Sequence, residues 1–159
     1  MLRSLQQIFQ SAKEVYRVLG TGHSEAVYHK AMEVELRLNG LQYSTKSPVS
    51  IPYKGHIVGY NEPDLLVTFE ENTIVVELKA TTYPPRETEK AQLQSYLRTL
   101  NTGYGVLINF PQPTSKENNP EEIHFLKYGF DAFIQKEPDI EFKLPTGILS
   151  VPTLNLNDV

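Results

Sequence analysis

The 159-residue chain contains no cysteine and only four histidines, which are scattered along the sequence. The absence of cysteine excludes a disulfide framework, a zinc–thiolate site and a thiol nucleophile. The sequence also lacks a long apolar run and a signal-like segment, so we expect a soluble intracellular protein. Basic residues are not in excess, because the formal net charge is −4. Any binding to nucleic acid must therefore use a local basic patch.

One strand-like segment carries two charges among apolar neighbours. Residues 73–80 read Thr-Ile-Val-Val-Glu-Leu-Lys-Ala, a β-branched run typical of a buried strand. Because side chains alternate across a strand, Glu77 and Lys79 lie on one face, and Val76 and Leu78 lie on the other. We expect the second face to be core and the first face to carry the chemistry.

A second segment, residues 64–69, precedes a polar turn at residues 70–72, which predicts an antiparallel hairpin. If Phe69 pairs with Asn72, then Asp64 pairs with Glu77, and their Cβ atoms lie roughly 5 Å apart. A slip of one residue would point Asp64 elsewhere. Two carboxylates this close repel each other, and a divalent cation between them removes that penalty.

The paired carboxylates favour a magnesium site. Mg²⁺ prefers oxygen ligands and keeps several waters, so it could polarise a phosphate and supply a hydroxide nucleophile. Lys79 would then orient that water or stabilise the developing charge. The alternative is structural: Glu77 and Lys79 form an ordinary edge-strand ion pair, and Asp64 is a turn residue.

Helical periodicity predicts three helices. The first opens at Ser4, where Gln7 completes a capping box, and ends before residues 20–22. The second runs from near Ser24 to residues 39–40, and its core stripe is Val27, Ala31, Val34 and Leu38. A neighbouring stripe holds Glu25, Tyr28, Met32 and Glu35. The third extends from about residue 87 to 100, and its core stripe is Leu93, Tyr96, Leu97 and Leu100.

The remaining segments predict a mixed sheet. Residues 47–53 and 56–60 flank Lys54 and Gly55, a hairpin signal. Residues 104–110 form an apolar strand after the third helix, so a right-handed crossover should place this strand parallel to the Glu77 strand. The expected fold is a single α/β domain, with helices packed on the sheet in the order α-α-β-β-β-β-α-β.

Two helical positions have both a functional and a structural interpretation. Gln92 lies one turn before Tyr96 and could hold a phosphate or a metal-bound water, or be a solvated residue beside a core tyrosine. Glu25 could serve the site or simply stabilise a helix N-terminus. Positive charge in the same region comes from Arg86, Lys90 and Arg98. These three residues could form the local basic patch or could be ordinary surface residues.

Four motifs in order resemble a known family. Residues 22–28, Gly-His-Ser-Glu-Ala-Val-Tyr, match the motif that names the GxxExxY family, a branch of the PD-(D/E)XK nuclease superfamily. Residues 63–64 (Pro-Asp) with 77–79 (Glu-Leu-Lys) resemble the superfamily signature. Residues 92–96, Gln-Leu-Gln-Ser-Tyr, are similar to the glutamine and tyrosine motif of RecB-like members. The likeness covers roughly residues 5–110.

The resemblance implies a restriction-endonuclease-like core in which Asp64 and Glu77 hold Mg²⁺ or Mn²⁺. In that scheme the backbone carbonyl of Leu78 is a further metal ligand, and Lys79 lies beside the attacking water. Glu25 would add an acidic metal ligand from the second helix. One departure from the usual pattern is an extra acid at position 62, directly before the Pro-Asp step.

The implied function is hydrolysis of phosphodiester bonds, with DNA as the expected substrate and Gln92 and Tyr96 lining the site. The reaction would be in-line attack of a metal-activated water on phosphorus. The alternative is a catalytically silent module that keeps the nuclease fold and binds nucleic acid or a protein partner. The intact Asp64, Glu77 and Lys79 set argues against decay.

The C-terminal part is harder to interpret. We expect a nuclease-like domain over residues 1–135, with a strand at residues 123–128, whereas residues 131–135 are too short to classify. Residues 136–159 form a tail too apolar for a free linker, and we expect extended strands packed on the domain or on a partner copy in a homodimer.

Overall fold

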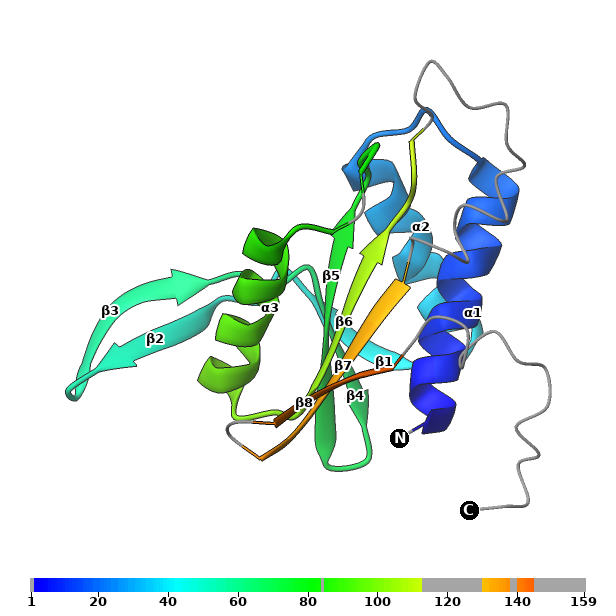
Figure 1. Cartoon of the computed structure of the whole chain (residues 1–159). Helices are drawn as coiled ribbons and strands as arrows, with labels where there is room; N and C mark the ends of the chain where they lie inside the picture. The colour runs from blue at the N-terminus through cyan, green and yellow to red at the C-terminus, as the bar shows by residue number, and fades with distance from the viewer. Residues whose placement is uncertain (1, 84, 113–129, 138–139, 145–159) are drawn as a thin grey trace.

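The computed structural model describes residues 2–83, 85–112, 130–137 and 140–144. It contains a six-stranded mixed sheet with helices on both faces (Figure 1). In spatial order the strands are β1 (Gln42–Thr45), β4 (Leu65–Phe69), β5 (Asn72–Lys79), β6 (Tyr104–Asn109), β7 (Phe130–Glu137) and β8 (Ile140–Leu144). The helices are α1 (Leu2–Leu19), α2 (Glu25–Leu38) and α3 (Glu87–Leu100). The expected α/β class is confirmed.

Alternation along β5 divides the core into two layers. Val76 and Leu78 belong to the larger cluster, which also contains the buried side chains of α1 and α2. Val75 faces the other way and packs with Leu93 and Leu97 of α3. The β5 face that carries Glu77 and Lys79 is therefore the face covered by α3.

The predicted register is confirmed. In β4 and β5, Phe69 pairs with Asn72 and Leu65 pairs with Val76, so the next pair outward is Asp64 with Glu77. The tight turn between these strands is possible because Glu70 adopts a left-handed conformation with φ of 51°. β6 lies parallel to β5 in the sheet interior, as the crossover through α3 predicts.

Two features of the strand order differ from the prediction. β1 was not predicted, because the segment Gln-Tyr-Ser-Thr has no apolar alternation and most of its side chains are exposed. The predicted hairpin forms as β2 (Val49–Tyr53) and β3 (His56–Asn61), but these strands make a separate two-stranded sheet. Five strands therefore precede α3 in the chain.

Two predictions for the first helices are wrong. α1 already begins at Leu2, so Ser4 lies inside the helix, where it is fully buried, and does not cap it. Most of the predicted core stripe of α2 faces outward, at Val27, Val34 and Leu38, which are 41%, 43% and 75% exposed. Ala31 of that stripe packs against the core, as predicted. Tyr28 and Met32 of the neighbouring stripe are buried together with Leu36, which the prediction did not include, whereas Glu25 of that stripe is exposed. The three larger, buried side chains remove more apolar surface from water than valines would.

α3 follows its prediction closely. Leu93, Tyr96 and Leu97 are buried, and Asn101 ends the helix in a left-handed conformation with φ of 50°. Gly105 of β6 lies directly beneath this helix. A Cβ atom at this position would be 3.1 Å from terminal methyl groups of Leu93 and Leu97, so glycine permits the close approach of helix and sheet.

The C-terminal strands extend the sheet beyond β6. β7 pairs antiparallel with β6 and includes residues 131–135, which sequence patterns left unclassified. β8 pairs antiparallel with β7, so part of the expected tail joins the sheet. The boundary predicted at residue 135 lies inside β7, and the division into domain and tail stays a prediction. The strand expected at residues 123–128 lies outside the described residues.

Among the helices that the structure describes, none has the length and apolar character needed to span a membrane.

Candidate metal centre

Asp64 and Glu77 meet where β4 begins and β5 ends. The backbone N–H of Asp64 donates to Oε1 of Glu77 over 3.1 Å, and the backbone N–H of Leu78 donates to Oδ2 of Asp64 over 2.9 Å. Each carboxylate is thus held by the other strand's backbone. Glu77 is buried, with 4% of its surface exposed, and Asp64 is half-buried.

The electrostatics of this pair favour a bound cation. Burial and the nearby carboxylate of Asp64 raise the pKa of Glu77 to about 7, although the Asp64 N–H and the Lys79 ammonium act in the opposite direction. The shift arises because two negative charges share a site of low polarity. Carboxylate oxygens are the ligands that Mg²⁺ and Mn²⁺ prefer, so the donor set fits such an ion.

Lys79 lies on the same face of β5 as Glu77, as predicted. Its Nζ atom is 3.9 Å from Oε2 of Glu77, and its side chain is 21% exposed. The ammonium group is therefore close enough to Glu77 to lower that residue's pKa, while it still reaches solvent. This position suits a group that contacts an incoming phosphate or water.

Glu25 lies apart from the other two acids. It is the first residue of α2 and is exposed, and its charge makes only the smallest of the contributions to the raised pKa of Glu77. No three His, Cys, Asp or Glu side chains within the described part of the chain cluster tightly enough to hold a metal ion. The structure brings Asp64 and Glu77 together but does not add Glu25 to them as a third close ligand.

Gln92 and Tyr96 interact with each other beside the carboxylates. Nε2 of Gln92 donates to the Tyr96 hydroxyl over 2.7 Å. Burial raises the pKa of Tyr96, and the charges of Glu77, Asp64 and Glu62 add to this rise. The negative charges of Glu77 and Asp64 therefore act on the Tyr96 hydroxyl, and the extra acid at position 62 adds to their electrostatic effect.

Tyr28, in the predicted family motif, anchors the loop before α2. Its hydroxyl donates to the carbonyl of Gly20 over 2.7 Å. Its buried ring stacks on Phe110, with a centroid distance of 4.5 Å and an interplanar angle of 4°. This residue holds the loop against the end of β6, so its role is structural.

His29 is a residue that sequence patterns missed. It is buried, and its Nε2 atom lies 3.1 Å from the backbone carbonyl oxygen of Asp64 and 3.3 Å from Oγ1 of Thr45. Its Nδ1 atom lies 3.0 Å from Oε1 of Glu33. Because carboxylate and carbonyl oxygens are both acceptors, both contacts are hydrogen bonds when each ring nitrogen carries a hydrogen. The spacing of four residues between His29 and Glu33 was the available signal.

Asn109 is a second missed residue, located opposite Lys79 in the β5–β6 ladder. It is buried, and its Oδ1 atom accepts hydrogen bonds from the backbone N–H of Thr81 at 2.9 Å and the hydroxyl of Thr81 at 3.1 Å. Its Nδ2 atom donates to the carbonyl of Tyr83 over 3.2 Å. The side chain therefore fixes the loop that leaves the site toward α3.

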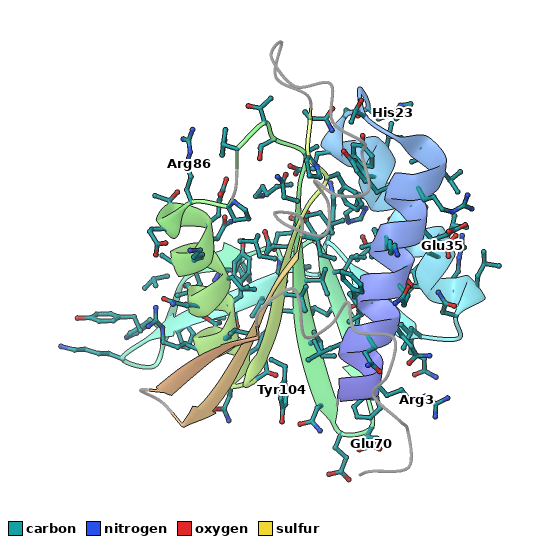
Figure 2. All side chains as sticks on the ribbon, turned by 45° about the vertical axis from the view of Figure 1, so that its right-hand side comes forward. Arg3, His23, Glu35, Glu70, Arg86 and Tyr104 are labelled. Carbon is teal, nitrogen blue, oxygen red and sulfur yellow. The ribbon has the colours of Figure 1, made fainter. Side chains whose placement is uncertain are left out.

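Only part of the basic patch expected from Arg86, Lys90 and Arg98 is available to bind phosphate. Arg86 stands at the start of α3 and points away from the helix (Figure 2), with its guanidinium 3.8 Å from the Tyr83 ring centroid. Lys90 is 2.7 Å from a carboxylate oxygen of Glu87, and Arg98 is exposed near the end of the helix. The charge of Lys90 is therefore partly neutralised within the helix.

Comparisons with known proteins address the family and the fold. Residues 3–121 match a family model described as the PD-(D/E)XK nuclease superfamily. The crystal structure of SSO0001 is similar at a TM-score of 0.45 and 18% identity over 79% of this chain and 54% of that one, so the chain spans about half the length of SSO0001. A Holliday junction resolvase from Archaeoglobus fulgidus is similar at a TM-score of 0.39 and 14% identity over 78% of this chain and 90% of that one. No curated protein matches significantly.

The family match includes every residue of the predicted site, from Glu25 to Tyr96. The Pro-Asp step, the Glu-Leu-Lys run and the pairing of the strands that carry them all lie within it. On this evidence, the chain belongs to the PD-(D/E)XK nuclease superfamily.

Proposed function

We propose that the chain is a divalent-metal-dependent nuclease, with Asp64 and Glu77 as the residues that hold Mg²⁺ or Mn²⁺. The observation that carries the proposal is the pair of buried Glu77 and half-buried Asp64, in which burial and the charge of Asp64 raise the pKa of Glu77. A protein that needed only a stable core would gain stability from an apolar residue at position 77. The pair is therefore best explained by a cation that it binds.

The other residues have distinct roles in this proposal. When bound, the cation would neutralise phosphate charge and make water more acidic. The Leu78 carbonyl would add an oxygen ligand, as in the family scheme. Lys79 would orient the water that attacks phosphorus in line, or stabilise charge on the phosphate. Glu25 would reach the site from α2 as a more distant acid.

Gln92 and Tyr96 would line the site on the α3 side. Their mutual hydrogen bond and the acidic field at the Tyr96 hydroxyl support this placement. The same pair is the basis for proposing a RecB-like relationship. The Gly-x-x-Glu-x-x-Tyr run at residues 22–28 is the basis for proposing membership of the GxxExxY branch.

The substrate in this proposal is DNA, and a homodimer is the proposed assembly. Both α2 and α3 begin at the end of the sheet where β5 ends (Figure 1). Helix N-termini carry partial positive charge, so this end of the molecule is suited to phosphate groups.

Cleavage assays test the function directly. Labelled single-stranded, duplex and branched DNA and RNA are incubated with Mg²⁺ or Mn²⁺ and either the wild type or the Asp64→Ala or Lys79→Ala variant. We expect metal-dependent cleavage that falls by roughly 100-fold or more in each variant. Glu70→Ala is the matched control, because Glu70 is an exposed acid in the β4–β5 turn at the opposite end of the sheet (Figure 2).

Two other outcomes of these assays would not support the nuclease proposal. Cleavage that persists in both variants would identify a contaminating nuclease. Absence of cleavage with every substrate, together with calorimetry that finds no Asp64-dependent Mn²⁺ binding, would favour the catalytically silent module.

A further inference from the structure

Large exposed apolar side chains in the described residues fall into two groups. One group is aliphatic and lies on α1 and α2, at Val18, Val27, Val34 and Leu38. The other lies on the β2–β3 hairpin, at Tyr53, Ile57, Val58 and Tyr60, each between 60% and 67% exposed. The hairpin group differs in chemistry, because it contains two tyrosines and lies beside a lysine. Aromatic rings next to cations are the usual platform for nucleic-acid strands, whereas aliphatic surface is not.

The hairpin is an arm with exposed side chains on both faces, and α3 contacts part of β2. Figure 1 shows β2 and β3 projecting from the body of the molecule. In the pairing register Tyr60 is opposite Ser50, and Ile57 is opposite Pro52, so these four exposed side chains share one face. Tyr53 pairs with His56 on the other face. Each face of the arm therefore presents an exposed tyrosine.

The tip of the arm combines a ring with a cation. Lys54 and Gly55 form the turn with φ angles of 48° and 83°, which holds Lys54 at the outermost point of the hairpin. The Nζ atom of Lys54 lies 5.4 Å from the centroid of the Tyr53 ring. A base that stacks on this ring would bring its phosphate within reach of the lysine.

The local charge of the arm also favours a polyanion. Residues 36–61 contain no Asp or Glu, although the chain as a whole has a net charge of −4. The arm itself carries Lys46, Lys54 and His56, all exposed. This segment can attract phosphate although the molecule as a whole would repel it.

The base of the arm is attached to the candidate metal centre. β3 ends at Asn61, and Asp64 follows three residues later. The backbone N–H of Lys46, where the chain enters the arm, donates to the carbonyl of Asp64 over 3.2 Å. A strand bound along the arm would therefore lead toward the carboxylate pair.

We propose that the β2–β3 arm binds a nucleic-acid strand with unpaired bases, which passes around the hairpin so that bases stack on Tyr53 on one face and on Tyr60 on the other, while Lys54 pairs with phosphate. This inference rests on the proposed nuclease function and defines its substrate as one with a single-stranded segment. Bases in a duplex stack on one another, so their faces are closed to the tyrosines.

Fluorescence anisotropy without divalent metal tests the arm separately from catalysis. The probes are a labelled random-sequence single strand and the same sequence as a duplex. We expect Tyr53→Ala and Tyr60→Ala each to weaken single-strand binding roughly tenfold, because one stacked base is lost. Tyr53→Phe and Tyr60→Phe keep the ring and should bind as the wild type does. Val34→Ala is the matched control, since it removes an exposed apolar side chain from α2.

Three binding results would overturn the proposal. These are absence of single-strand binding, unchanged affinity in both alanine variants, and tighter binding of the duplex than of the single strand. Light scattering that showed Tyr60→Ala dissociating a dimer would assign the arm to a second copy of the chain. Thermal unfolding of each variant confirms that the fold is intact.

The experiments can contradict the arm proposal and the nuclease proposal independently. If Asp64→Ala abolishes cleavage while the tyrosine variants bind normally, only the arm proposal is wrong. If binding depends on the tyrosines but no substrate is cleaved with Mg²⁺ or Mn²⁺, the nuclease proposal is wrong and the arm is retained.

Discussion

At the scale of single residues, Glu77 links the stability of the metal-free protein to pH. Its pKa is about 7 in the folded chain, compared with an ordinary value of 4.5. The folded state therefore keeps a proton that the unfolded state releases between these two values. The resulting stability is fully present below pH 4.5, falls as the pH rises through 7, and amounts to about 3 kcal/mol at most.

Chemical denaturation in the presence of a chelator measures this effect. We expect the free energy of unfolding of the wild type to fall between pH 5 and pH 8, with Glu77→Gln removing most of the decrease because the amide does not ionise. Added Mn²⁺ should restore stability to the wild type at pH 8 but not to the variant. A wild type whose stability is flat over this range would contradict the raised pKa.

His29 is expected to position Asp64. Its imidazole contacts the Asp64 carbonyl on one side and Glu33 on the other, so its loss frees the backbone that carries the metal-binding carboxylate. Partners of this kind typically contribute 10- to 100-fold to metal affinity. We expect His29→Ala to weaken Mn²⁺ binding by about tenfold in calorimetry, and His29→Gln to recover part of it through its side-chain N–H donor.

A purely structural role for His29 would give a different pattern. Leu36→Ala removes another buried side chain of α2 and should lower stability while Mn²⁺ affinity stays unchanged. Equal losses of affinity in His29→Ala and Leu36→Ala would show that general destabilisation, and not the contact with Asp64, weakens the metal site.

Local sequence patterns were sufficient to predict the positions of some of these residues and insufficient to predict the contacts of others. The shared face of Glu77 and Lys79 follows from strand alternation, and the pairing of Asp64 with Glu77 follows from a short turn. The contact between His29 and Asp64 joins residues 35 positions apart. The packing of α2 against β1 and β5 brings these two residues together, so no local spacing could reveal the contact.

At the scale of elements, the two faces of α2 have opposite sensitivities to mutation. Met32 is fully buried, whereas Val34 is 43% exposed. We expect Met32→Ala to reduce the free energy of unfolding by about 2–5 kcal/mol, because it leaves a cavity between the helix and the sheet. Val34→Ala should change it by less than about 0.5 kcal/mol. Urea denaturation of both variants measures these changes. A larger loss of stability in Val34→Ala than in Met32→Ala would show that the face first predicted from sequence is the core face.

Elements with a single strong pattern were predicted well. α3 has one apolar stripe and clear end signals, and its bounds match the prediction. α2 has two adjacent stripes that could each face the core, and the choice depends on which one the sheet and α1 accommodate. β1 joins the sheet through backbone pairing with β4, which its side chains do not indicate.

At the scale of the whole molecule, the acidic net charge limits how nucleic acid can bind. With Lys46 and Lys54 as the lysines of the arm, about two phosphates are neutralised, which predicts a slope of log affinity against log salt between about −1 and −2. Lys54→Ala should make this slope shallower by about 0.7. Anisotropy titrations at several salt concentrations measure both values.

A much steeper slope would instead indicate that cations beyond the arm contribute. Arg86, directly before α3, and Arg98 on α3 are exposed candidates, and their alanine variants in the same titration would identify them.

The arm begins and ends at one place in the sheet. Thr45 pairs with Leu65, and the backbone N–H of Lys46 meets the carbonyl of Asp64, so the chain enters and leaves the arm side by side. A segment attached in this way can be shortened, lengthened or exchanged while the register of β1, β4 and β5 is kept. If the arm binds substrate as proposed, exchanging it would change substrate choice while the carboxylate pair stays in place.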